Sequence, residues 1–330
     1  MPTYDVVAIG NALVDVISHE SHELLAEIGL EPGSMNLVDA DRVHELYALL
    51  GPATEVSGGS AANTIAGIAS FGGRAAFIGR VADDDFGEIY THDLRSIGVH
   101  FDAPRAPRDG APTGRCLVMV TPDAQRTLNT FLGAGTDLDE RYVDEALIAD
   151  AQVLYLEGYL WDQPAAMAAF RRASEVAHAA GRKVALSLSD SFCVERHREA
   201  FCDLMEGHVD IVFANEPEIL ALYEVDDFDA AVPRVRGHVD IAVLTRGASG
   251  SAIVTAAEVI DIDPHPVAQL VDTTGAGDLY AAGFLYGYTN GHALDVCGQL
   301  ASLAAAEIIS HLGARPETSL AELASTLLAR

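Results

Sequence analysis

Lysine is almost absent from this chain of 330 residues, because the sequence contains only Lys183. Acidic residues dominate its charge: 49 Asp and Glu stand against 20 Lys and Arg, and the formal net charge is −29. A chain this acidic is repelled by phosphate backbones and by anionic membrane surfaces. We therefore expect neither nucleic acid nor a membrane as a partner. A phosphate group could still bind locally, through backbone N–H groups of loops and helix N-termini.

Several motifs that define other mechanisms are missing. The sequence has no G-x-x-x-x-G-K-[ST] loop, no H-E-x-x-H, no G-x-S-x-G, and no G-x-G-x-x-G after a predicted strand. These absences argue against a P-loop, a zinc protease, a serine-type hydrolase and a dinucleotide-binding enzyme. Because the one lysine begins a predicted strand, a phosphate site must rely on backbone N–H groups, a metal ion and arginine.

Signals for export, for disulfides and for a zinc site are also scarce. No apolar run reaches transmembrane length, and no basic segment followed by an apolar one opens the chain. The cysteines are scattered without a C-x-x-C pair, which is typical of buried thiols in a reducing compartment. We expect a cytoplasmic protein. The four cysteines are Cys116, Cys193, Cys202 and Cys297.

Apolar runs rich in β-branched residues alternate with helix-length segments. One such segment, Gln163–Ala180, has a proline near its start and Gly181 just past its end, which favours a helix. The alternation predicts a doubly wound, mostly parallel sheet between two layers of helices, a three-layer α/β fold. The strand-like runs are Tyr4–Gly10, Ala75–Val81, Gln152–Leu156, Lys183–Leu188, Val209–Ala214 and Asp240–Thr245.

Two stretches, Gly33–Asp39 and Gly114–Leu132, depart from this alternation. Both have strand-like composition without intervening helices, and the second contains a predicted turn at Pro122-Asp123. Strands without crossover helices favour antiparallel pairing, so we predict a small antiparallel lobe. The lobe is a lid over the carboxyl ends of the main strands, or else a fixed edge extension of the sheet. The predicted ranges are 17–57 and 103–133 for the lobe, and 1–16, 58–102 and 134–330 for the large domain.

The strongest signal for chemistry is the segment Asp272–Asp278, which reads DTTGAGD. Gly275 and Gly277 permit a tight turn in which several N–H groups point at one anion, and the apolar run that follows is typical of a buried helix. Asp278 would lie at the positive end of that helix. There it could take the proton of a substrate hydroxyl that attacks a phosphoryl group, or it could merely cap the helix.

A second glycine-rich segment, SGGSAAN, precedes another helix-like run. The pair Gly58 and Gly59 lets a ligand approach the backbone closely. Ser60 is expected to cap the helix, and Asn63 would then lie on its first turn and face the same opening.

Polar residues also follow other predicted strands at their carboxyl ends. Asn11 and Asp15 follow the first strand, and Asp15 could bind a diol through two hydrogen bonds or cap a turn. Asn215 and Glu218 follow a later strand, where Glu218 could hold Mg²⁺ through water or serve as a favourable acid in a first helical turn. The segment Thr245–Gly250 ends a strand in a turn that could cradle a nucleotide.

Together these segments resemble the ribokinase-like (PfkB-type) family of carbohydrate and purine kinases. Its two signature regions are similar to Gly58–Gly87 and Asp272–Leu285, and the order and spacing agree over nearly the whole chain. The resemblance implies ATP-dependent phosphorylation of a primary hydroxyl, with Asp278 as the base. It further implies an anion hole formed by Gly275, Ala276 and Gly277, ATP binding by Asn215, Thr245, Gly247, Gly250, Gly275, Gly277 and His311, and Mg²⁺ binding by Glu218 through water.

Within the family the chain looks most like adenosine kinases. Gly10–Asp15 is similar to their N-terminal motif, whose aspartate binds the ribose diol, and a lid strand similar to theirs places Arg126 for phosphate. Leu160 stands where those kinases often place an aromatic residue, so the side chain that stacks on a base is left open between Tyr159, Trp161 and Phe192. The acceptor contacts implied are Asn11, Asp15, Met35, Gly58, Gly59, Asn63, Leu160 and Phe192.

We therefore expect a kinase that uses ATP and Mg²⁺ and phosphorylates the 5′-hydroxyl of adenosine. A sugar kinase acting on ribose, fructose or 2-keto-3-deoxygluconate is the alternative within the family, and a catalytically silent nucleoside-binding protein is the alternative from another class. Some relatives bind a monovalent cation near the positions of Asp272 and Ser310, which leaves K⁺ open as a cofactor. The sequence does not distinguish a monomer from a homodimer.

Overall fold

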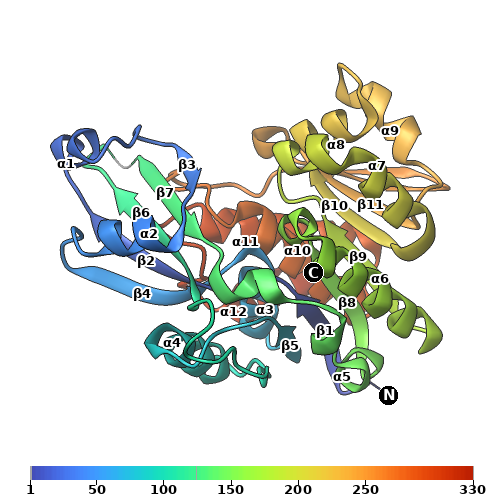
Figure 1. Cartoon of the computed structure of the whole chain (residues 1–330). Coiled ribbons are helices and arrows are strands. Elements are labelled where there is room, and N and C mark those ends of the chain that lie inside the picture. The colour runs from blue at the N-terminus through green and yellow to red at the C-terminus, as the bar shows by residue number, and fades with distance from the viewer. Residues whose placement is uncertain (1, 124, 330) are drawn as a thin grey trace.

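The computed structural model describes residues 2–123 and 125–329. Met1, Ala124 and Arg330, which belong to the predicted domain ranges, lie outside the described residues. The described chain forms two sheets, a large one near the middle of the molecule and a small one on one side (Figure 1).

The large sheet has eight strands in the order β13-β12-β11-β10-β9-β8-β1-β5. The six neighbouring strands from β5 to β11 run parallel to one another. Beyond β11, β12 pairs antiparallel with β11, and β13 pairs antiparallel with β12. Apolar runs form these strands because both faces are covered, and Val6, Val7, Ala8 and Ile9 of β1 are fully buried. The predicted fold class is confirmed. The strands are β1 (Tyr4–Ile9), β5 (Ala75–Ile78), β8 (Ala151–Glu157), β9 (Lys183–Ser187), β10 (Ile211–Asn215), β11 (Ile241–Thr245), β12 (Ser251–Thr255) and β13 (Val259–Ile262).

Helices cover both faces of the large sheet (Figure 1). One layer contains α3 (Ser60–Ser70), α4 (Asp85–Ser96), α10 (Ala276–Thr289), α11 (Leu294–Ile308) and α12 (Leu320–Leu328). The other layer contains α5 (Glu145–Ala149), α6 (Pro164–Ala179), α7 (Ser191–His208), α8 (Glu216–Tyr223) and α9 (Phe228–Val235). Single turns of 3-10 helix add η1 (Gly133–Asp137), η2 (Glu140–Tyr142), η3 (Gly158–Asp162) and η4 (Gly247–Ser249). Among the described residues no helix is long and apolar enough to cross a membrane.

The small sheet has five strands in the order β3-β7-β6-β2-β4. The predicted antiparallel arrangement is only half right, because β2–β4 and β6–β7 are antiparallel whereas β2–β6 and β3–β7 are parallel. The expectation failed because each parallel pair joins an early strand, β2 or β3, to a later one, β6 or β7, and the chain between them passes through α3, β5 and α4 of the large sheet and its helical layer, which gives the long connection that parallel pairs require. Two helices between the early strands were also missed. The strands are β2 (Leu13–His19), β3 (Met35–Leu37), β4 (Ala53–Gly58), β6 (Gly114–Val120) and β7 (Arg126–Phe131), and the helices are α1 (His22–Glu27) and α2 (Ala40–Tyr47).

The missed helices have clear local causes. Ser21 accepts a hydrogen bond from the N–H of Leu24 and begins α1, while Asp39 accepts one from Arg42 and begins α2. Leu25 and Leu46, one from each helix, are fully buried in the same core as the small sheet. The division into a lid and a large domain stays a proposal, in which the small sheet with α1 and α2 is the lid.

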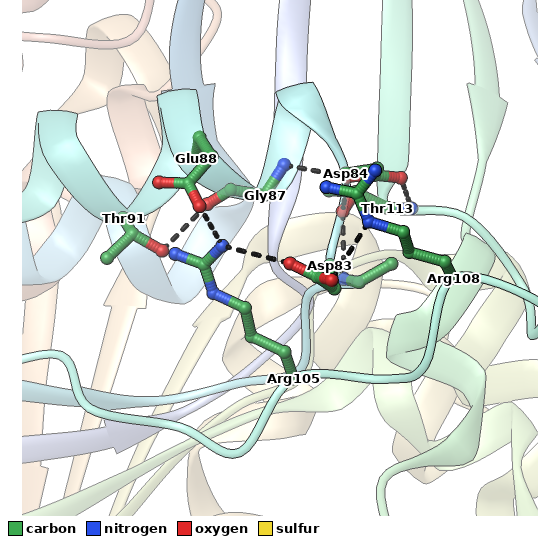
Figure 2. Close-up of polar contacts among 9 residues, drawn as sticks. Asp83, Asp84, Gly87, Glu88, Thr91, Arg105, Arg108 and Thr113 are labelled. Atoms are coloured by element: carbon green, nitrogen blue, oxygen red, sulfur yellow. Dashed lines mark hydrogen bonds and ion pairs between the residues drawn. The ribbon is translucent and has the colours of Figure 1, made fainter.

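The chain enters β6 through a polar cluster at the start of α4 (Figure 2). Asp84 caps α4 by accepting from the N–H of Gly87, and the same carboxylate accepts from the N–H and the hydroxyl of Thr113 at 2.8 and 2.6 Å. Thr113 in turn accepts from the N–H of Ala82 at 2.9 Å. Because Thr113 directly precedes β6, this cluster ties the connection that leads into the small sheet to the start of α4.

Two arginines of the loop before β6 extend this cluster. Arg105 pairs with Glu88 and lies 3.8 Å from Asp83, and Arg108 bonds to Asp83 at 2.9 Å (Figure 2). These pairs are largely exposed to solvent, so each contributes little to stability compared with the Asp84 cluster.

We predict that Asp84→Ala lowers the free energy of unfolding by about 1–3 kcal/mol, because a helix cap and two hydrogen bonds to Thr113 are lost together. Urea denaturation measures the change. Asp85→Ala is the matched control, since Asp85 lies in the same first turn but is exposed and should cost at most about 1 kcal/mol. Equal losses in the two variants would contradict the assigned role of Asp84.

Candidate active site

A cavity of about 610 Å³ lies at the carboxyl edge of the large sheet, beside the small sheet. Parallel strands place the residues that follow them at one edge, so residues distant in sequence meet there. Asn11, Glu157, Ser187, Asn215 and Thr245 each stand at or just after the end of a different parallel strand and line the cavity. The small sheet contributes Leu13, Asp15, Met35, Leu37, Cys116, Leu128 and Thr130.

Asp278 lies in the first turn of α10 and lines this cavity. The helix begins after Gly275, which has a left-handed φ of 78°, so Asp278 is three residues beyond the N-cap and does not cap the helix. Its two carboxylate oxygens accept from the hydroxyl of Ser60 at 2.6 Å and from the amide of Asn63 at 2.9 Å. Burial raises the pKa of Asp278, whereas these two hydrogen bonds and Arg315 favour the charged form.

The expected capping role of Ser60 is wrong. Ser60 is the first residue of α3, and the N-cap is Gly59, with a φ of 95°. A Cβ on Gly59 would lie 2.2 Å from the carbonyl oxygen of Asn11, so only glycine fits between α3 and the end of β1. Because Ser60 is not the cap, its hydroxyl is available to Asp278.

The turn before α10 has the form expected of an anion site, with one correction. The N–H of Ala276 is already bonded to the carbonyl of Thr273 at 3.2 Å, so it is a weaker contributor to the predicted anion hole. The N–H groups of Gly277 and Asp278 belong to a first helical turn, whose donors lack acceptors inside the helix. A side chain on Gly277 would project into open space, so this position leaves room for a ligand.

Asp15, on β2 of the small sheet, has no hydrogen-bond donor among the described residues. A Cβ on Gly58 would lie 2.3 Å from Oδ2 of Asp15, so Gly58 acts by making room for this carboxylate and does not itself line the cavity. Burial raises the pKa of Asp15 to about 6, against opposing attraction from Arg315 and Arg126. A half-buried carboxylate with unused acceptor capacity is suited to a ligand that brings hydroxyl donors.

Two charged residues of the site escaped the sequence analysis. Glu157 ends β8, is 1% exposed and lines the cavity. Arg315 lies behind the cavity and donates to the carbonyls of Ser57 and Ala62 at 2.9 and 2.6 Å. Burial lowers the pKa of Arg315, but Asp15 and Asp278 favour its charged form. The one sequence feature that could have pointed to Glu157 is its position directly after a predicted buried strand. No sequence feature pointed to Arg315.

Asn215 and Glu218 form a reciprocal cap at the start of α8. Glu218 accepts from the N–H and the amide of Asn215 at 2.9 and 2.7 Å, and Asn215 accepts from the N–H of Glu218 at 2.9 Å. Burial raises the pKa of Glu218 to about 7. No group of three or more His, Cys, Asp or Glu that could hold a metal occurs in the described ranges. Mg²⁺ usually keeps several waters and binds phosphates with one or two carboxylates, so Glu218 fits a contact through water.

Arg126 does not line the cavity, contrary to its expected position for phosphate. It pairs with Asp272 at 2.7 Å, with both side chains nearly buried, and donates to Thr274 at 3.1 Å. Asp272 also accepts from Thr274 and from the N–H of Gly313. Both oxygens of Asp272 therefore have partners in this structure, and Ser310 donates to a backbone carbonyl. Binding of a monovalent cation near these residues stays a prediction.

Four further predicted contacts also lie away from the cavity walls: Leu160, Gly247, Gly250 and His311. Leu160 is 1% exposed and packs in the core behind the sheet, because η3 turns it inward. Gly250 has a φ of 82° and packs against the carbonyl of Ile262, so it serves the hairpin between β11 and β12. Nε2 of His311 lies 3.1 Å from Oε1 of Glu307, which is four residues earlier in the chain.

The three aromatic residues considered for stacking on a base differ in whether they reach the cavity. Trp161 is fully buried and stacks on Phe201, so it is not available to a ligand. Tyr159 and Phe192 both line the cavity, and Phe192 is 69% exposed. Met35, also predicted as a contact, lines the cavity from the small sheet and is 60% exposed.

Comparisons with known proteins identify the family and agree with the fold. A family model described as pfkB family carbohydrate kinase matches residues 33–320. Adenosine kinase of Saccharomyces cerevisiae is 26% identical over 94% of this chain and 96% of its own length. 5-dehydro-2-deoxygluconokinase of Geobacillus thermodenitrificans is 26% identical over 83% of this chain and 84% of its own length.

Solved structures match over nearly the full chain. The structure of adenosine kinase from Sinorhizobium meliloti is 50% identical, with a TM-score of 0.91 and coverage of 98% of this chain and 99% of that chain. A probable sugar kinase from Rhizobium etli is 46% identical, with a TM-score of 0.92 and full coverage of both chains. The resemblance predicted from the two glycine-rich segments is thereby confirmed.

The raised pKa of Asp15 predicts a cost in stability. The native carboxyl, with a pKa of about 6, holds its proton more tightly than an ordinary one at 3.8, so the free energy of unfolding falls as pH rises through that window. Asp15→Asn removes this cost. We expect it to stabilise the protein by about 1–3 kcal/mol at pH 7.5 and by little near pH 4.

Urea denaturation at the two pH values checks this expectation. Asp41→Asn is the control, because Asp41 is an exposed carboxylate on α2, which packs on the same sheet. A variant at Asp15 that is no more stable than the native protein at pH 7.5 would contradict the raised pKa.

Proposed function

This chain belongs to the pfkB family of carbohydrate kinases, and we propose that it transfers the γ-phosphoryl group of ATP to the 5′-hydroxyl of adenosine. Kinase chemistry of this kind needs a base for the acceptor hydroxyl, donors for the phosphoryl oxygens and a cavity that excludes water. The cavity around Asp278 offers the first two, and closure of the proposed lid over the bound substrates would exclude water.

Asp278 is the base in this proposal. As the acceptor oxygen forms a bond to the γ-phosphorus, its proton passes to the Asp278 carboxylate, and the bond to the β,γ-bridging oxygen breaks to release ADP. Ser60 and Asn63 hold both carboxylate oxygens, which fixes the aspartate in the first turn of α10. The raised pKa of Asp278 makes it a better proton acceptor than an ordinary aspartate.

The phosphates of ATP would lie between the turn at Gly275–Gly277 and the strand ends at Asn215 and Thr245. Free N–H groups at the positive end of α10 favour negative charge on the transferring group. Mg²⁺, when bound, neutralises phosphate charge, and Glu218 would hold it through water. Arg126 could reach phosphate only by exchanging its pairing with Asp272.

The observation that carries the choice of a nucleoside is the apolar wall of the cavity. Met35, Leu37 and Phe192 are 60%, 70% and 69% exposed, although large apolar side chains are normally buried. They line the cavity together with Leu13 and Leu128, from two separate parts of the fold. A flat purine would cover this surface, whereas a bare sugar would leave much of it in water. Asp15 would accept from the two ribose hydroxyls.

A sugar kinase is the second candidate, and the comparisons give it specific support. The probable sugar kinase from Rhizobium etli is 46% identical to this chain, close to the 50% of the adenosine kinase from Sinorhizobium meliloti. In that case Met35 and Leu37 of the proposed lid would line the entrance to the cavity and would not form a pocket for a purine base.

The test is ADP release from Mg-ATP with adenosine, inosine, guanosine, ribose, fructose and 2-keto-3-deoxygluconate as acceptors. We expect adenosine to give the highest kcat/KM, and Asp278→Asn to lower kcat by about 10²–10⁴-fold while nucleotide binding survives. Preference for a bare sugar would overturn the nucleoside assignment and keep the chemistry. Near-native turnover of the variant would overturn the role of Asp278, and binding of adenosine without turnover would indicate a silent nucleoside-binding protein.

A further inference from the structure

One buried carboxylate at the cavity, Glu157, has no part in the transfer described above. It is the last residue of β8 and is 1% exposed. Oε1 accepts from the N–H and the side-chain amide of Asn11 at 3.1 and 2.6 Å, and Oε2 accepts from the N–H of Ala61 at 2.8 Å. All three partners are uncharged donors, so the carboxylate is buried without a salt bridge. Such a group is costly, and structures that keep one usually use it.

The first consequence concerns the side chain of Asn11. An amide can be turned by 180°, which exchanges its oxygen and nitrogen. Here the nitrogen faces the Glu157 carboxylate, because the oxygen in that position would face another acceptor at 2.6 Å. The amide oxygen of Asn11 is consequently left without a partner among the described residues, although Asn11 is 3% exposed. A buried acceptor of this kind at a cavity wall suits a hydroxyl donor on a ligand.

The second consequence concerns the start of α3. Ala61 is the second residue of that helix, and its N–H has no acceptor within the helix. Glu157 accepts this N–H and so anchors the first turn. Ser60 and Asn63, which hold the two oxygens of Asp278, belong to the same turn. By holding this turn, Glu157 also helps to hold Asp278, the proposed base, in position.

The packing around Glu157 is built for this contact. A Cβ on Gly10 would lie 2.6 Å from Oε2 of Glu157 and 2.5 Å from the Cβ of Ala61. Glycine at position 10 therefore allows β1, β8 and α3 to meet at the carboxylate. Burial and, to a smaller extent, the Asp278 carboxylate raise the pKa of Glu157 to about 7, against the opposing effect of the donors from Ala61 and Asn11. The other titratable groups that face it are the neutral phenols of Tyr90, Tyr155 and Tyr159.

We propose that Glu157 is a positioning residue for the acceptor: its charged form orients Asn11 and anchors the first turn of α3, and so places the acceptor hydroxyl against Asp278. The inference rests on the proposed kinase function. It goes beyond that function by assigning acceptor affinity to a residue that touches neither the phosphate nor the reacting oxygen.

Glu157→Gln tests this role with little change of shape. A glutamine can accept at one position only, so its NH₂ group must face either the two donors of Asn11 or the N–H of Ala61. We expect the KM for the acceptor to rise about 10- to 100-fold, while the dissociation constant of Mg-ATP changes less than about 3-fold. In the native chain, protonation of Glu157 should lower kcat/KM as the pH falls through about 7. Glutamine does not titrate, so in the variant the fall in kcat/KM should begin at a lower pH.

Asp5→Asn is the matched control. Asp5 is 8% exposed at the opposite end of β1, and it also accepts three donors, from the N–H and guanidinium of Arg74 and from Gln152. It should lower the free energy of unfolding to a similar degree and leave the KM for the acceptor and the pH profile unchanged. A residue with a purely structural role would behave in this way.

The outcomes separate this inference from the proposed function. No turnover of the native chain on any acceptor overturns the function itself. Native turnover with a Glu157→Gln variant that matches the Asp5→Asn control in KM and pH profile overturns only the inference. If Glu157→Gln does not fold, Glu157→Asp takes its place, since it keeps the charge and withdraws the carboxylate from Asn11 and Ala61: a raised acceptor KM at constant Mg-ATP affinity supports the inference, and an unchanged KM overturns it.

Discussion

The fold gathers negative charge at one place and partly shields it from water. Asp15, Glu157 and Asp278 come from three different elements and line one cavity, where burial raises the pKa of each. Arg315 supplies compensating positive charge from behind, without a direct hydrogen bond to any of the three. Carboxylates held this way are costly to the native state and are good acceptors for hydroxyl donors. Most other features of the site serve to hold these three groups in place.

The helix α3 is the common support of the site. Its first turn bonds to Glu157 on one side and to Asp278 on the other, so it connects the end of β8 with the start of α10. Gly59 lets this helix begin directly against the end of β1. The small sheet then brings Asp15 and an apolar surface to the opposite side of the cavity, through a connection fixed by Asp84 and Thr113 (Figure 2). Chemistry and acceptor binding thus depend on separate parts of the fold that meet at one edge.

The sequence predicted what depends on local pattern. Apolar runs gave the parallel strands of the large sheet, and the glycines of DTTGAGD gave the turn before α10 with Asp278 in its first turn. It did not predict contacts between distant residues. Asn11 and Glu157 are 146 positions apart, and Arg315 and Ser57 are 258 apart, so no spacing in the sequence links them.

The errors have the same physical origin. Ser60 has the ordinary signature of a helix cap, but tertiary contact with Asp278 decides its role. Arg126, which was expected to face phosphate, pairs with Asp272 in this structure, and its role in phosphate binding stays a prediction. Leu160 was placed at the base pocket by position in the chain, whereas the 3-10 turn η3 directs it into the core. Polar side chains at a cavity choose among several partners, and only the folded arrangement decides between them.

The central claim is that Asp15 and Asp278 accept hydrogen bonds from the hydroxyls of the substrate that is phosphorylated, while Glu157 supports them without touching it. A hydroxyl that donates to a carboxylate favours its charged form, so binding must lower the pKa and release protons where the group is partly protonated. Calorimetric titration of adenosine into the protein at pH 6.5, in buffers of low and high ionisation enthalpy, measures that number of protons directly. We expect net proton release, seen as a binding heat that depends on the buffer. A heat that is the same in both buffers, or net proton uptake, would contradict it.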